Sequence, residues 1–131
     1  MKTSIKQEWI AYIHGLQDTI CAALEKADGK ATFIEDKWER ADGGGGITRV
    51  IGNGNVFEKG GVNTSVVYGD VTNEIRKELK IYGSKWFACG LSLVLHPSNP
   101  FVPTVHCNYR MFELYDDHNE VIDRWFGGGT D

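Results

Sequence analysis

The sequence predicts an α+β protein in which one long amphipathic helix precedes a mostly antiparallel β-sheet. Apolar residues recur at three- and four-residue steps through residues 4–27, and from residue 31 onward the apolar period falls toward two. Turn-forming stretches at 42–46, 52–54 and 116–119 separate the alternating segments, without a regular return to helix. We therefore expect a large sheet flanked by helices rather than repeated βαβ units.

The individual elements follow from these patterns. Ser4 is a suitable N-cap for the first helix, and Asp28-Gly29 is a suitable end. The apolar stripe of this helix is expected to pack on the sheet. The polar segment 72–80 predicts a short exposed helix. Strands are expected at residues 31–40, 46–52, 64–70, 85–96, 104–115 and 120–126.

Composition and charge narrow the class of protein. With 131 residues, 41% of them hydrophobic, the chain is long enough for a single domain with its own core. A net charge of −4 and the lack of a Lys/Arg run argue against nucleic-acid binding. Three scattered cysteines without CxxC spacing favour reduced thiols, and hence the cytoplasm. No segment is long and apolar enough to predict a transmembrane span.

The stretch HPSNPFVPTVH at 96–106 contains all three prolines of the chain, with a histidine at each end. Prolines at three-residue intervals predict an extended, polyproline-like connection that braces the two flanking strands. If those strands pair antiparallel, alternation brings five polar side chains to one face. Arg110 favours an anion site there, because a guanidinium binds a carboxylate bidentately. The five residues are Ser92, His96, His106, Asn108 and Arg110.

Spacing alone leaves other interpretations of the histidines open. Two histidines beside a proline loop are more often structural or surface residues than ligands. A metal site would also need further ligands from elsewhere, since the HxxxH and CxxC spacings are absent.

The glycine-rich stretch 43–61 lacks the Gly-Lys-Ser/Thr and GxGxxG patterns of nucleotide sites. It predicts either a close approach of the backbone to a flat ligand or a crowded turn. Three basic residues near it either meet an anionic ligand or pair with acidic neighbours. The basic residues are Arg40, Arg49 and Lys59, and the acidic ones are Glu39, Asp42 and Glu58.

Taken together, these stretches resemble the oxygen-dependent coproporphyrinogen III oxidase family over nearly the whole chain. The matching stretches are LQDTIC at 16–21, FIEDKWER at 33–40, GGGGITRV at 43–50, NVFEKGGVNTSVVYG at 55–69, GLSLVLHPSNPFVPTVHCNYRMFE at 90–113 and WFGGGTD at 125–131.

The resemblance implies a large, flat antiparallel sheet with helices on both sides, acting as a homodimer. It implies the oxidative decarboxylation of two propionates of coproporphyrinogen III to vinyl groups, giving protoporphyrinogen IX in haem biosynthesis. Molecular oxygen is then the co-substrate, and no organic cofactor is expected, which agrees with the missing nucleotide motif. Whether a divalent metal cation is required stays open.

The resemblance also implies roles for individual residues. Ser92 and the run Asn108, Tyr109 and Arg110 match substrate-binding positions. His106 matches a proton donor, and an imidazole is suited to this role near neutral pH. His96 and His106 match positions of metal ligands in bacterial members.

Family members continue well beyond the motif that ends at Asp131, and Gly61 and Cys107 stand where alanine is usual. We therefore expect residues 1–131 to form the N-terminal portion of a larger domain and to be inactive alone. Two alternatives are a non-catalytic module that binds a tetrapyrrole or a metal, and a purely structural interaction domain. The structural alternative predicts that the polar side chains around the proline loop point to different places.

Overall fold

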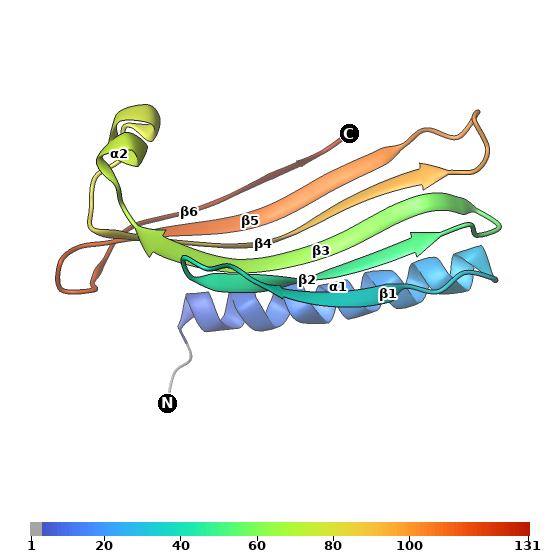
Figure 1. The fold of residues 1–131 in the computed structure, drawn as a ribbon, viewed down its shortest axis with the longest axis horizontal. Coiled ribbons are helices and arrows are strands. Elements are labelled where there is room, and N and C mark those ends of the chain that lie inside the picture. The colour runs from blue at the N-terminus through green and yellow to red at the C-terminus, as the bar shows by residue number, and fades with distance from the viewer. Residues whose placement is uncertain (1–3) are drawn as a thin grey trace.

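The computed structural model describes residues 4–131, and it confirms the α+β class. The long helix α1 (Ile5–Asp28) lies against one face of a six-stranded antiparallel sheet (Figure 1), and the short helix α2 (Asn73–Leu79) lies at one end of it. The strands neighbour one another in chain order. They are β1 (Ile34–Glu39), β2 (Gly44–Gly52), β3 (Phe57–Asp70), β4 (Lys85–Pro97), β5 (Val105–Tyr115) and β6 (Val121–Thr130).

Helix α1 begins and ends where its capping residues predict. The Ser4 hydroxyl accepts a hydrogen bond from the Gln7 N–H at 3.1 Å. At the other end Gly29 adopts a left-handed conformation, with φ of 77°, and its N–H donates to the Glu25 carbonyl. The predicted short helix is also present as α2, and none of its residues is buried.

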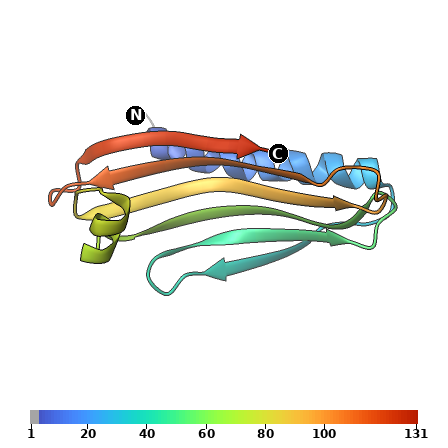
Figure 2. The same ribbon diagram turned by 90° about the horizontal axis from the view of Figure 1, so that it is seen from above.

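The core lies between α1 and the sheet. Every second residue of β4 from Phe87 to Leu95 is buried here, because the side chains of a strand alternate between its two faces. We call the other side of the sheet the open face, because no helix packs along it within residues 4–131 (Figure 2). The buried residues of the core are Ile13, Cys21, Ile51, Phe57, Val62, Phe87, Cys89, Leu91, Leu93, Leu95, Cys107 and Met111.

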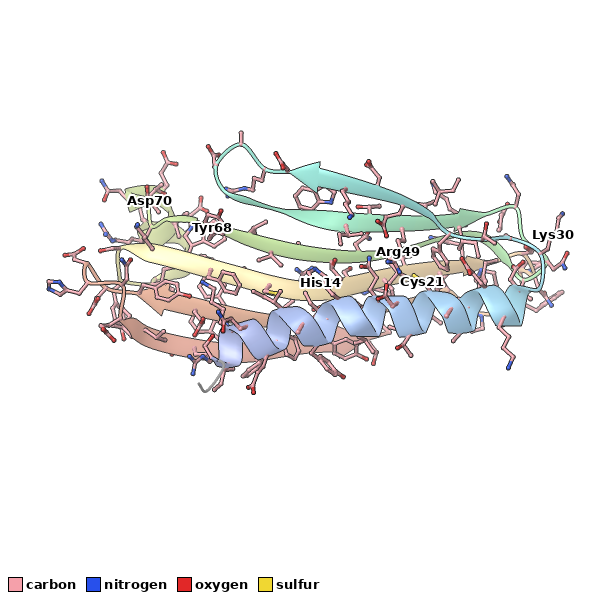
Figure 3. All side chains as sticks on the ribbon, turned by 90° about the horizontal axis from the view of Figure 1, so that it is seen from below. His14, Cys21, Lys30, Arg49, Tyr68 and Asp70 are labelled. Carbon is pink, nitrogen blue, oxygen red and sulfur yellow. The ribbon has the colours of Figure 1, made fainter. Side chains whose placement is uncertain are left out.

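Polar side chains beneath α1 are paired within the fold. Gln17 is 1% exposed, and its Nε2 donates to the carbonyl oxygens of Ile47 on β2 and Val62 on β3. Its Oε1 accepts from the Thr64 hydroxyl. Arg49, which lies beside α1 in Figure 3, binds carboxylates on α1 and β1, with 2.7 Å to Asp18. These polar groups therefore make hydrogen bonds within the fold although they are buried or partly buried.

Asp28 ties the end of α1 to the β2–β3 turn. Its buried carboxylate accepts hydrogen bonds from five backbone N–H groups on both segments. These bonds, first of all that from Ala31, hold the pKa of Asp28 well below its usual range. The donors are Lys30, Ala31, Asn55, Val56 and Phe57.

Several boundaries differ from the sequence prediction. β3 begins at Phe57 rather than at residue 64, because the backbone of Gly60 and Gly61 pairs with β4 although neither has a side chain to pack. For the same reason β6 extends through its glycines to Thr130. The sheet and its two helices agree with the predicted fold class, and within residues 4–131 one face of the sheet carries the long helix.

The proline segment is a turn rather than an extended polyproline-like path. The Val102 N–H donates to the Asn99 carbonyl at 3.1 Å, and the Phe101 N–H donates to Asn99 Oδ1 at 2.9 Å. An asparagine that bonds backbone two residues on is a strong turn former, and it outweighs the proline spacing here. The segment still connects β4 and β5 as an exposed loop.

The Asp28 junction yields a stability prediction. Asp28→Asn puts an amide N–H₂ group among N–H donors, so the urea midpoint of unfolding falls. Because the pKa of Asp28 is lower in the folded state than in the unfolded state, its carboxylate stabilises the fold at pH values above the unfolded pKa, which is near 3.9 for aspartate. This stabilisation is lost as the pH falls further. The difference between wild type and variant should therefore shrink below about pH 4. A difference that is constant from pH 7 to pH 3 contradicts this account.

Candidate functional site

Five of the six predicted site residues share the open face. In the register of β4 and β5, Ser92 lies directly opposite Asn108, and Gly90 lies directly opposite Arg110. These side chains therefore share one face of the sheet, as the pairing of the two strands predicted. The five residues are Ser92, His96, His106, Asn108 and Arg110.

Tyr109 lies on the other face. Its register partner is Leu91, which belongs to the core beneath α1. The neighbouring Cys107 thiol on the same face raises the pKa of the Tyr109 hydroxyl. The sheet thus separates the Tyr109 side chain from the five residues on the open face.

The two histidines lie on the same face but not directly opposite each other. His106 pairs with Val94, whereas His96 lies two residues farther along β4. The Nδ1 atom of His106 is 3.4 Å from a carboxylate oxygen of Asp131. The Nδ1 atom of His96 is 3.5 Å from the Thr104 hydroxyl.

Residues 4–131 do not by themselves form a metal centre. They contain no group of three or more His, Cys, Asp or Glu side chains placed to hold a metal ion. Two imidazoles fall short of the three or four protein ligands typical of such sites. The predicted role of His96 and His106 as ligands therefore needs donors from outside this segment.

Arg110 is the only arginine of the described chain whose side chain has no partner there. It is exposed, and it lies two residues along β5 from Asn108, which is the next position on the same face. A free guanidinium beside hydroxyl and amide groups is suited to binding a carboxylate. The four partnered arginines are Arg40 with Asp42, Arg49 with Asp18 and Glu35, Arg76 with the Gly83 carbonyl, and Arg124 with Glu113.

The basic residues near the glycines have different surroundings. Arg49 faces α1 and is neutralised there, so it does not supply charge to the open face. Arg40 lies 3.9 Å from Asp42, the pairing that the surface interpretation predicted. Lys59 lies next to His96 in the register of β3 and β4, and it has no ion pair within residues 4–131.

The glycines serve close packing within the sheet. Gly43 and Gly44 have φ of 131° and 88°, which confirms the crowded-turn interpretation for the β1–β2 hairpin. On the open face, a Cβ on Gly46 would collide with the indole of Trp38. A Cβ on Gly90 would lie 2.9 Å from Arg110 Cγ, so the missing side chain makes room for the arginine.

Sequence reasoning missed part of the open face. Thr48 lies opposite Asn63, and Asn63 lies opposite Ser92. Three aromatic rings from β4, β5 and β6 are also stacked on this face, with centroids 6.3 Å apart for Trp86 and Phe112, and 4.5 Å apart for Phe112 and Trp125. Alternation within one strand does not reveal these neighbours, because they depend on the register between strands.

The chain matches a known family over nearly its whole length. The coproporphyrinogen III oxidase profile matches residues 8–131. The chain belongs to the coproporphyrinogen III oxidase family. A relative from Prochlorococcus marinus, named oxygen-dependent coproporphyrinogen-III oxidase, is 52% identical over 126 residues, which cover 92% of this chain and 34% of the relative.

A second relative, from Glycine max, is named oxygen-dependent coproporphyrinogen-III oxidase, chloroplastic. It is 48% identical over an alignment that covers 98% of this chain and 36% of the relative. The chain thus spans about a third of the length of the curated relatives it matches. Within residues 4–131, no helix is both long and apolar enough to cross a membrane.

Two glycines of the open face provide a matched test of its packing. Gly90→Ala should lower the free energy of unfolding by about 1–3 kcal/mol, because the added methyl group meets the Tyr109 carbonyl and the Arg110 stem. Gly61→Ala should leave it unchanged or raise it by up to about 1 kcal/mol, since the nearest atom is 3.6 Å away. Urea denaturation of both variants measures the difference. Equal effects at the two positions would show that the described packing around Gly90 is wrong.

Proposed function

We propose that this segment forms one wall of the substrate site of an oxygen-dependent coproporphyrinogen III oxidase. The observation that carries the proposal is the unpaired Arg110, which lies on the same face as Ser92 and Asn108. An unpaired guanidinium with neutral hydrogen-bonding groups beside it suits a substrate with several carboxylates. Membership of the family and the names of the relatives support the same substrate.

The proposed reaction converts two propionate groups of coproporphyrinogen III to vinyl groups, giving protoporphyrinogen IX. For each group, the carboxylate leaves as carbon dioxide and one hydrogen leaves the carbon next to the ring. Molecular oxygen accepts the two electrons, and with that hydrogen and one further proton it becomes hydrogen peroxide. Each decarboxylation therefore consumes one proton, which a group in the site must supply.

Each residue of the site on the open face has a separate role in this reaction. Arg110 binds a propionate carboxylate and so orients the substrate. Ser92 and Asn108 hydrogen-bond the substrate beside it. His106 supplies the proton, since an imidazole exchanges protons readily near neutral pH. The Nδ1 atom of the imidazole lies 3.4 Å from a carboxylate oxygen of Asp131, a contact that orients the ring.

The remaining parts of the proposal come from the family resemblance. We propose molecular oxygen as co-substrate without an organic cofactor, and a homodimer as the working assembly. A metal bound by His96 and His106 would require ligands from outside this segment. The proposed compartment is the cytoplasm, and the three free, buried cysteines agree with a reducing environment.

The roles of Arg110 and His106 can be separated by kinetics on the complete protein that contains this segment. Arg110→Ala should raise KM for coproporphyrinogen III about 10- to 100-fold, because a charge-assisted hydrogen bond to the carboxylate is lost. The KM of Arg110→Lys should lie between those of the wild type and Arg110→Ala. Protoporphyrin fluorescence after oxidation of the product measures turnover. Arg76→Ala, which removes an arginine from the exposed helix α2, is the matched control.

His106→Ala should lower kcat about 10²- to 10⁴-fold, with a smaller effect on KM, since a proton donor acts in the chemical step. Two results count against the proposal. One is an Arg110→Ala variant that behaves like the Arg76→Ala control, and the other is an unchanged kcat in His106→Ala. Saturable binding of coproporphyrin III without turnover in the unmodified protein would favour the non-catalytic module instead.

A further inference from the structure

Four polar residues occupy the same level of the open face on four adjacent strands. Thr48 on β2 lies opposite Asn63 on β3, Asn63 lies opposite Ser92 on β4, and Ser92 lies opposite Asn108 on β5. We call these four residues the polar row. Because neighbouring strands are about 4.8 Å apart, the row is about 14 Å long.

The polar row differs from the polar groups beneath α1 in having no partners. No side chain of the row makes a hydrogen bond within residues 4–131, although all four residues are half-buried. Beneath α1, by contrast, Gln17, Thr64 and Glu113 are each bonded. Half-buried amides and hydroxyls that lack protein partners are suited to bonding a ligand.

Within the row, Asn63 points along the face toward the level of His106. A Cβ on Gly61 would be 3.6 Å from Asn63 Nδ2, so the amide nitrogen lies near Gly61. Gly61 is opposite Val94, which in turn is opposite His106. The donor end of Asn63 therefore lies between the polar row and the level of the proposed proton donor.

Charge on the open face favours Asn63 over Thr48 as a contact for an anionic group. Asp36 on β1 lies opposite Thr48, and its carboxylate would repel a ligand carboxylate there. Asn63 is one strand farther from Asp36. Arg110 is on β5, two strands from Asn63, or about 10 Å across the sheet. A ligand with carboxylates on different sides of a large ring can reach both.

We infer that Asn63 is a further substrate-binding residue, whose amide N–H₂ group donates to a second propionate carboxylate while Arg110 binds the first. The inference rests on the proposed function, because it requires a tetrapyrrole that carries several carboxylates. Ser92 lies on β4 between the strands of the two contacts, and Asn108 lies on β5 two residues from Arg110, so both continue the same hydrogen-bonding surface.

The test uses the complete protein and two unreactive probes, coproporphyrin III and its tetramethyl ester. Asn63→Ala should weaken binding of coproporphyrin III about 3- to 10-fold, as expected for loss of one neutral hydrogen bond. Asn63→Asp keeps the shape but puts negative charge against the carboxylate, so it should weaken binding by more than about 10-fold. The ester lacks the charged carboxylates, so Asn63→Asp should change its affinity by less than about 3-fold.

Asn73→Asp is the matched control. It makes the same chemical change in exposed α2, where Asn73 Oδ1 already accepts from Arg76. This control should leave the affinity for both probes unchanged. Thermal unfolding checks that the Asn63 variants keep the fold, and a raised KM with an unchanged kcat in Asn63→Ala separates binding from a general structural effect.

The outcomes distinguish this inference from the proposed function. If Asn63→Ala and Asn63→Asp bind coproporphyrin III as the wild type does while Arg110→Ala binds weakly, only the role of Asn63 is wrong. If Asn63→Asp binds as well as the wild type or better, while Asn63→Ala binds weakly, Asn63 contacts a ring N–H group and the carboxylate assignment is overturned. If the unmodified protein binds neither probe, both proposals fail.

Discussion

The packing of α1 on one face of the sheet fixes the register on which the other features depend. Because side chains alternate, a slip of one residue in any strand would move its polar residues to the opposite face. Gln17 opposes such a slip, since its amide bonds carbonyl groups of both β2 and β3 from the buried side. Asp28 holds the β2–β3 turn against the end of the helix in the same way. The helix side thus determines which residues reach the open face.

The two faces differ in how their polar groups are satisfied, and this difference is the main argument for function. Beneath α1, charged and polar side chains bind one another, as Arg49 does with Asp18 and Glu113 does with Arg124. On the open face, Arg110 and the polar row have no such partners within residues 4–131. The rings of Trp86, Phe112 and Trp125 add a flat apolar surface beside them. Unpaired polar groups next to aromatic rings suit a ligand that is both carboxylated and largely apolar.

The sequence was sufficient for those features that depend on a single element. The caps of α1 correctly predicted the helix, and the alternation along β4 and β5 correctly predicted the shared face of Ser92 and Arg110. Features that depend on contacts between elements were not accessible. Asn63 belongs to the row only through its pairing with Ser92, and glycines obscured where β3 begins. Tyr109 shows a different limit of reasoning from a motif. It stands between Asn108 and Arg110 in the sequence, but consecutive residues of a strand point to opposite faces, so its side chain lies on the other side of the sheet.

We propose that the open face, and not the helix side, contacts the tetrapyrrole. Side-chain amide NMR of the ¹⁵N-labelled complete protein, titrated with coproporphyrin III, tests it directly. Our account predicts that the amide signals of Asn63 and Asn108 and the Nε–H signal of Arg110 shift with saturation, while the buried amide of Gln17 does not. Shifts confined to Gln17 and its neighbours on α1, or no shifts in the three open-face groups at saturation, would contradict it.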